Sequence, residues 1–237
     1  MIQNPEDLGI SIIIPFCNEE QNVESVLQET RRTNPLAEII AVDDGSTDST
    51  AERIRAFPDI RLVSFPKNLG QSAALYAGLV SASRNVCALM DGDGQHDPAC
   101  IRDLLRELDK YDVVCGYRRT REDRWQIRVA SRIANYVRRY FTGDCIRDAG
   151  CTMKIIRKEH IRFLIPFSEM QYYMAGMLQR AGLTIGEVAV NHRPRKFGRS
   201  KYTILRRAWR GIWDLLGVCW LLRRQIHWPE DYPHRCI

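Results

Sequence analysis

Short apolar runs, each followed by a polar loop and then by a helix-like segment, set the pattern of the first half of the chain. Strands that alternate with such helices indicate a mostly parallel sheet with helices on both faces. We therefore predict an α/β fold, with strands at 10–15, 38–42, 61–65, 85–90 and 112–117 and helices at 19–32, 70–82 and 98–110. A further helix ends at Ala56, and Ser46 or Asp48 can cap it. In such a fold, ligands bind beyond the carboxyl ends of the strands.

The pattern changes after residue 118. Residues 124–140 are predicted as an amphipathic helix, 150–157 and 184–190 as strands with a helix between them, and 191–202 as a basic loop. The remainder is predicted as a helix to Arg224. No internal repeat or low-complexity linker divides the chain. We predict one domain over residues 1–203 and a basic, amphipathic helical extension over residues 204–237.

The net charge of +6 is unevenly distributed. Acidic side chains outnumber basic ones up to residue 115, whereas basic ones dominate the remainder. This division predicts a metal or nucleotide site in the first half and an anion-binding region in the second, although a solvated surface is the alternative. The hydrophobic content of 45% argues against a disordered chain.

Eight cysteines occur without a C-x-x-C pair, and several lie inside apolar runs. We expect buried free thiols in a reducing cytoplasm rather than disulfides or a zinc site. The N-terminus shows no secretory signal. The longest apolar run, 211–222, is shorter than the roughly 20 residues that cross a bilayer.

The most acidic loop, DGDGQHDPA, directly follows the strand at 85–90. Asp91 and Asp93 alternate in what we expect to be an extended stretch, so both carboxylates would face one side, and Gln95 continues the spacing. Mg²⁺ and Mn²⁺ prefer such oxygen ligands and often bridge them to substrate phosphates. The alternative is an exposed acidic turn in which Asp97 caps the next helix. We expect His96 to hold the loop through a structural hydrogen bond rather than to act as a base or metal ligand.

Other predicted strands also end in polar loops. Glu19 follows the first strand and Asp44 the second. After the third strand, Asn68 precedes the next predicted helix and Gly70 begins it. Each loop alone is explained by a turn, a helix cap or close helix–sheet packing. Because these loops share one edge of the predicted sheet, together they favour a nucleotide-plus-metal site.

Six motifs occur in the order PFCNE, VDDGSTDST, KNLGQSAAL, MDGDGQHDP, GYR and RPRKFGRSKY. Together they resemble the family 2 inverting glycosyltransferases of the GT-A fold. More narrowly, they are similar to the branch that transfers mannose to dolichyl or polyprenyl phosphate. The resemblance covers about residues 10–205 and implies a GT-A catalytic domain that uses Mg²⁺ or Mn²⁺.

The resemblance implies roles for the matching positions. Residues expected to line the nucleoside pocket are Pro15, Cys17, Glu19, Val42 and Asp44. Residues expected to hold the metal and the donor diphosphate are Asp91, Gly92, Asp93 and Gln95, the last two as the direct ligands. Contacts to phosphates or to the sugar are expected from Arg118, Arg195 and Lys201. The acceptor phosphate is assigned to Arg118 and Arg128, and the catalytic residues are expected to be Asp93, Arg118 and Arg195.

The chain departs from the family pattern at two of these positions. Cys17 stands where relatives usually have Tyr, which puts selectivity for the nucleobase in doubt. Gly92 stands where Ala is common, and we expect a backbone contact there to survive that change.

The implied reaction transfers a hexose, with mannose from GDP-mannose favoured, to a polyprenyl or dolichyl phosphate. An alternative is a UDP-sugar donor with a polyprenyl phosphate or a saccharide hydroxyl as acceptor; a hydroxyl would need a base such as Asp148 or Glu169. A non-catalytic protein that binds nucleotides or nucleic acid is a further alternative, but no nucleic-acid-binding motif supports it.

The acceptor's lipid tail would stay in a bilayer. Segments 124–140 and 202–224 combine arginine with aromatic residues, including Trp209, Trp213 and Trp220, as interfacial helices do. We therefore expect a peripheral protein at the cytoplasmic face, bound to an anionic membrane surface or to a membrane-anchoring partner. The alternative is a helix packed on the domain or in an oligomer contact.

Overall fold

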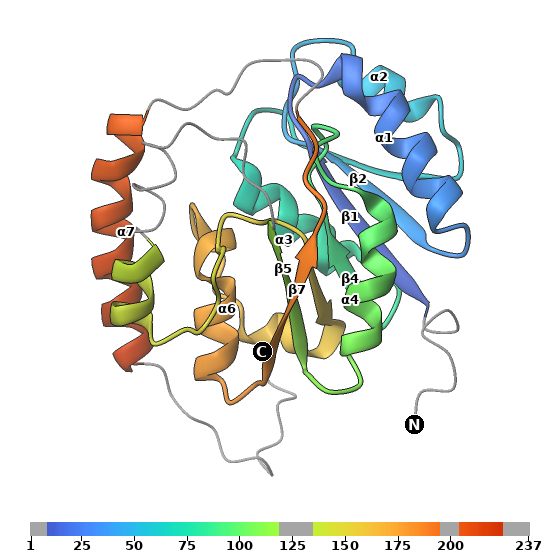
Figure 1. The fold of residues 1–237 in the computed structure, drawn as a ribbon. Coiled ribbons are helices and arrows are strands. Elements are labelled where there is room, and N and C mark those ends of the chain that lie inside the picture. Colours follow the sequence, from blue (N-terminus) through green and yellow to red (C-terminus); the bar gives the residue numbers. More distant parts are fainter. Residues whose placement is uncertain (1–8, 119–134, 195–203, 225–237) are drawn as a thin grey trace.

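The computed structural model describes residues 9–118, 135–194 and 204–224 (Figure 1). Its seven strands are β1 (Ile10–Phe16), β2 (Glu38–Asp43), β3 (Arg61–Ser64), β4 (Val86–Leu89), β5 (Val113–Arg118), β6 (Lys154–Arg157) and β7 (Ile185–Val190). Its labelled α-helices are α1 (Glu20–Thr33), α2 (Thr50–Arg55), α3 (Gln71–Ser81), α4 (Ile101–Glu107), α6 (Met170–Arg180) and α7 (Ile204–Arg224). Residues 135–142 are also helical, and two 3₁₀ segments are η1 (Pro98–Cys100) and η2 (Lys158–Phe163).

The seven strands form one sheet in the order β3-β2-β1-β4-β6-β5-β7. The pairs β2–β3, β1–β2, β1–β4 and β5–β7 are parallel, whereas β6 is antiparallel to both β4 and β5. The carboxyl ends of six strands therefore share one edge with the beginning of β6. This confirms the predicted mostly parallel α/β sheet.

Two apolar layers cover the sheet. Helices α1, α2 and α4 pack on one face, and α3, α6 and α7 pack on the other (Figure 1). The sequence of β1, ISIIIPF, is almost continuously apolar, and the structure gives the reason: of its seven residues, only Pro15 is not buried. A strand covered on both faces has no solvent side for polar residues.

The small residues of α3 let it approach the sheet closely, as the sequence predicted. A Cβ on Gly78 would lie only 2.3 Å from Ile13 Cγ2 and 3.2 Å from Val42 Cγ2. The side chain of Val42 is completely buried in this contact. That position speaks against a direct contact between this side chain and a nucleoside.

Several boundaries differ from the sequence prediction. The strand expected over 150–157 begins only at Lys154, and the helix expected over 98–110 begins as a 3₁₀ turn and ends at Glu107. Of the helix expected over 124–140, residues 119–134 lie outside the described residues. The seven cysteines within the described ranges are free thiols, of which Cys145 is exposed.

Helix α7 joins the core through Val218 and Leu222, and Tyr173 Oη of α6 lies 3.5 Å from the Gly211 carbonyl oxygen. The domain division at residue 203 stays a prediction. Among the helices of the described ranges, none has both the length and the apolar content to cross a membrane.

Candidate functional site

Asp44, at the end of β2, organises the loop before α3. Its carboxylate accepts hydrogen bonds from Asn68 Nδ2 (2.9 Å), from the Leu69 N–H (2.7 Å) and from the Gly70 N–H. The side chain is almost fully buried, so these donors replace the water that an ionised carboxylate needs. Asp44 thus fixes the start of α3, and its expected contact with a nucleoside stays a prediction.

The loop after β1 is tied to the loop after β2. Asn18 Oδ1 accepts a hydrogen bond from the Thr47 N–H (2.7 Å), and the Glu19 N–H donates to Thr50 Oγ1 (2.9 Å). The Glu19 carboxylate accepts from Asn22 Nδ2 at 2.6 Å. Cys17 Sγ lies 3.0 Å from Asn68 Nδ2. The structure therefore gathers Cys17, Glu19 and the Asp44 loop at one end of the sheet.

Asp91 turns toward the interior. Its Oδ1 accepts a hydrogen bond from Gln71 Nε2 at 2.6 Å, and the Thr152 hydroxyl also bonds to the carboxylate. Burial raises the pKa of Asp91; the Thr152 hydrogen bond and the positive charges of Lys154 and Arg118 act in the opposite direction. These contacts fix the orientation of Asp91 from two other elements of the fold.

The expectation that Asp91 and Asp93 lie in an extended stretch is wrong, because residues 92–94 form a turn in which Gly94 has a φ of +76°. Gly92 passes so close to the end of β1 that a Cβ would lie 2.6 Å from the Pro15 carbonyl oxygen and from the Phe16 ring. In this chain the turn therefore needs glycine at position 92. The expected backbone contact of Gly92 with the donor diphosphate stays a prediction.

Asp93 and Gln95 occupy the same turn. Asp93 Oδ1 accepts a hydrogen bond from the Gln95 N–H at 3.1 Å, and Gln95 Nε2 donates to the Arg193 carbonyl oxygen at 3.3 Å. The Gln95 amide oxygen is thus the end that can coordinate a cation. No cluster of three or more His, Cys, Asp or Glu suited to a metal occurs within the described ranges. One carboxylate and one amide oxygen fit an ion such as Mg²⁺, which is usually shared between few protein ligands and substrate phosphates.

His96 supports this turn from inside. It is buried, and its Nδ1 accepts a hydrogen bond from the Asp91 N–H at 3.2 Å. Burial lowers the pKa of His96 to about 4, so the ring is neutral at pH 7. The prediction of a structural hydrogen bond is confirmed.

Arg118 ends β5 at the same edge. Its guanidinium forms a bidentate ion pair with the Asp148 carboxylate, with Nε–Oδ2 at 2.7 Å and Nη2–Oδ1 at 2.9 Å. Only 17% of the Arg118 side chain and 8% of the Asp148 side chain are exposed. Lys154, which is 1% exposed, begins β6 and donates a hydrogen bond to the Cys151 carbonyl oxygen. Two cations of the basic second half therefore lie near the acidic turn.

Arg128, Arg195 and Lys201 lie outside the described residues, and their roles stay predictions. The start of the basic loop is described. His192 forms a β-bridge with His96, and Arg193 pairs with Glu29 (2.9 Å) and with Asp97 (3.1 Å). These contacts fix residues 192–193 beside the Asp91–Gln95 turn.

Sequence reasoning missed four residues that shape the site, namely Gln71, Thr152, Lys154 and Arg193. It named Asp148 as a candidate base but missed its ion pair with Arg118. One signal was present: polar residues recur at 148, 152 and 154 in a segment we predicted partly as a strand. A lysine in a strand is usually read as solvent-facing, whereas here it is buried.

This sheet, with acidic loops at its carboxyl edge and one antiparallel strand, defines the GT-A class of nucleotide-diphospho-sugar transferase folds. Crystal structures of glucosyl-3-phosphoglycerate synthase from Mycobacterium tuberculosis share it. The complex with Mn²⁺, UDP-glucose and phosphoglyceric acid has a TM-score of 0.70 at 22% identity, covering 94% of this chain and 87% of that one. The complex with Mg²⁺ and UDP has a TM-score of 0.65 at 23% identity, covering 89% and 80%.

The chain belongs to glycosyl transferase family 2, whose model matches residues 11–164. It is 36% identical over 234 residues to dodecaprenyl-phosphate galacturonate synthase of Rhizobium johnstonii, covering 92% of this chain and 68% of that protein. It is 31% identical over 208 residues to undecaprenyl-phosphate 4-deoxy-4-formamido-L-arabinose transferase of Serratia proteamaculans, covering 83% of this chain. The chain spans 64% of the length of that second relative.

Proposed function

We propose that this chain is a metal-dependent inverting glycosyltransferase that moves a hexose from a nucleoside-diphosphate sugar to a polyprenyl phosphate at the cytoplasmic face of a membrane. The main observation behind this proposal is the Asp91–Gln95 turn at the carboxyl edge of the sheet, close to the positively charged side chains of Arg118 and Lys154. Family membership and the names of the two polyprenyl-phosphate relatives support this reading.

The chemistry needs positioned charge more than it needs a base. A phosphate monoester has a second pKa near 6, so the acceptor is largely a dianion at pH 7 and is already a nucleophile. Arg118, held in place by Asp148, is suited to bind one of the two anions, since a guanidinium matches phosphate in a two-pronged contact. A bound divalent ion would supply Lewis-acid stabilisation of the departing diphosphate. Asp93 and Gln95 would hold that ion.

Asp148 is a poor candidate for a base that would activate a saccharide hydroxyl. Both of its carboxylate oxygens already bind Arg118, so protonation would disrupt the ion pair. This pairing argues against Asp148 as the base for a hydroxyl acceptor, and the role of Glu169, the other candidate, stays a prediction.

The motifs and the named relatives point to different donor sugars. The motifs favour GDP-mannose, whereas the named relatives handle galacturonate and a formamido-arabinose. Mn²⁺-dependent thermal stabilisation by GDP, compared with UDP, tests the nucleobase directly. A shift with GDP alone supports GDP-mannose, and a shift with UDP alone supports the UDP-sugar alternative.

The transfer itself is tested with purified full-length chain, Mn²⁺, a polyprenyl phosphate in detergent and a panel of labelled GDP- and UDP-sugars. We expect one donor to label the lipid, and we expect EDTA or Asp93→Ala to abolish the product. Asp103→Ala, which removes an exposed carboxylate on α4, is the matched control and should retain activity. Failure of every donor with folded, metal-loaded protein would contradict the proposal.

A further inference from the structure

An exposed aromatic surface lies on α7, away from the site described above. We call it the α7 face and define it by Trp213, Leu216, Trp220, Arg223 and Arg224. Trp213 is 61% exposed, Leu216 51% and Trp220 62%. These residues recur at intervals of three and four, so they share one side of the helix. The opposite side of α7 is buried through Val218 and Leu222.

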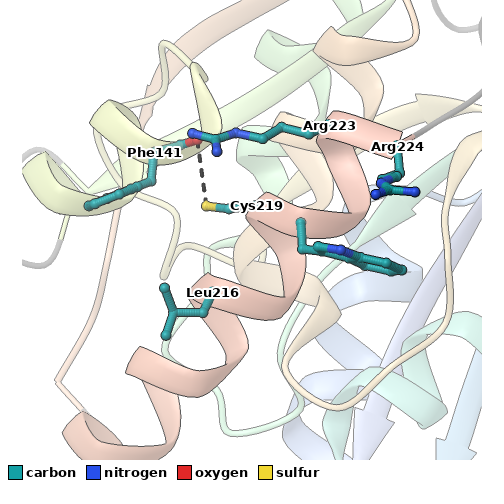
Figure 2. A pocket seen from close by; sticks show the side chains of 6 residues that line it. Phe141, Leu216, Cys219, Arg223 and Arg224 are labelled. Atoms are coloured by element: carbon teal, nitrogen blue, oxygen red, sulfur yellow. Dashed lines mark hydrogen bonds between the residues drawn. The ribbon is translucent and has the colours of Figure 1, made fainter.

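A shallow groove of about 270 Å³ opens within this face. Phe141 reaches it from the helix at 135–142, and the other lining residues, Leu216, Cys219, Trp220, Arg223 and Arg224, belong to α7 (Figure 2). The Cys219 thiol lies 3.6 Å from the Phe141 carbonyl oxygen and joins the two helices. Tyr136 and Tyr140 are exposed on the same neighbouring helix. The groove is therefore lined mainly by apolar side chains of two helices, together with Arg223 and Arg224.

The charges of the helix indicate what covers this surface. Residues 204–224 contain five arginines and a single acidic residue, Asp214. Arg223 and Arg224 stand at the end of the groove, and the Arg224 guanidinium lies 5.7 Å from the centre of the Trp220 ring. A second copy of the same helix would carry the same excess of positive charge, so two such helices would repel each other. An anionic surface would instead complement them.

We propose that the α7 face docks on an anionic phospholipid bilayer, with Leu216, Trp220 and Phe141 entering the headgroup boundary and Arg223 and Arg224 meeting lipid phosphates. Tryptophan and arginine on one helix side suit this boundary, because the rings bury an apolar body while the charged groups stay hydrated. The inference rests on the proposed function only in its premise that the acceptor is a membrane lipid.

The test is co-sedimentation of the full-length chain with vesicles of phosphatidylcholine alone, or with about one third phosphatidylglycerol, at low and high salt. We expect binding to the anionic vesicles only, with loss at high salt. Arg223→Gln/Arg224→Gln should weaken it by about 25-fold, since each arginine near such a surface contributes about fivefold. Leu216→Ser/Trp220→Ser should weaken it by at least about tenfold.

Matched variants control for general loss of charge and of apolar surface. Arg32→Gln/Arg55→Gln removes two exposed arginines from α1 and α2, and Leu36→Ser/Val80→Ser removes two exposed apolar side chains elsewhere. Both controls should bind vesicles within about twofold of the parent. Circular dichroism and thermal melting should show every variant folded.

Three outcomes would overturn the docking proposal: equal binding to neutral vesicles, unchanged binding by both α7 variants, or a parent dimer that Leu216→Ser/Trp220→Ser splits without affecting vesicle binding. The last would assign the face to a second copy. Transfer to polyprenyl phosphate in detergent separates this proposal from the function, because the α7 variants should keep that activity. A parent that docks through this face but transfers no sugar would support the docking surface and refute the proposed reaction.

Discussion

The ion pair between Arg118 and Asp148 offers the sharpest quantitative test of the site. Replacing Asp148 by Asn keeps the shape of the side chain but removes its charge and places an N–H₂ group opposite a cation. Both hydrogen bonds of the pair, at 2.7 and 2.9 Å, are affected. The remaining guanidinium is only 17% exposed, so water compensates for the lost partner incompletely.

The size of the effect follows from this burial. Removing one partner of a fully buried pair costs about 3–5 kcal/mol, and the partial exposure of Arg118 reduces our expectation to about 2–3 kcal/mol. For a chain of this length each kcal/mol lowers the melting temperature by about 2–4 °C, so Asp148→Asn should melt about 4–12 °C lower. Arg118→Gln leaves the Asp148 carboxylate, whose side chain is 8% exposed, without its cation, and should lower the free energy of unfolding by a similar amount.

A double-mutant cycle measures the pair itself. Urea unfolding of the parent, Asp148→Asn, Arg118→Gln and the double variant should give a coupling energy of about 2 kcal/mol, with the double variant nearly as stable as either single one. Arg106→Gln/Asp103→Asn provides the control, because that pair is exposed on α4 and should couple by less than about 0.5 kcal/mol. Additive effects at Arg118 and Asp148 would refute the argument that Asp148 holds Arg118 in place.

Three further outcomes are expected. Gly92→Ala should lose about 1–3 kcal/mol in urea unfolding, because the added methyl meets a carbonyl oxygen at 2.6 Å; undiminished stability would contradict the close approach. In initial-rate assays, His96→Ala should retain more transfer activity than Asp93→Ala, and equal, complete loss in two folded variants would reject that ranking. Burial lowers the pKa of His160, and its ring nitrogens have no hydrogen-bond partner within the described residues. Unfolding at acidic pH therefore takes up a proton, so the free energy of unfolding should decrease as the pH falls below about 6.5. Melting curves between about pH 5 and 7.5 should show a smaller decline for His160→Phe, and an unchanged slope would reject this assignment.

The sequence predicted the strands correctly where several consecutive residues are buried. β1, β2 and β5 follow from apolar runs that need cover on both faces, and the polar loops mark the edge where these strands end. The local pattern was insufficient for the acidic turn. Alternation predicted an extended stretch, but the close approach of Gly92 to β1 and the left-handed backbone of Gly94 produce a turn. Such an approach depends on a strand far away in the chain, so no short window of sequence contains it.

The partners of the charged residues were equally hidden, because they come from distant segments. Asp148 meets Arg118 across 30 positions and Gln71 meets Asp91 across 20, and neither spacing repeats anything along the chain. The antiparallel strand β6 explains the first of these meetings. It lies between β4 and β5 and starts at the edge where those two strands end, so the segment just before it passes the acidic turn.

The same topology gives the uneven charge of the sequence a physical meaning. Because β6 runs against its neighbours, Lys154 begins near Asp91, and the parallel strand β7 ends so that Arg193 meets Asp97. Basic residues of the second half thus face acidic residues of the first half at one edge, and each sign offsets the desolvation of the other. Two anionic substrates would repel each other at an edge that carried only the acidic loops. The arginines and lysine of the second half therefore supply the positive charge that the proposed transfer between a diphosphate and a phosphate requires.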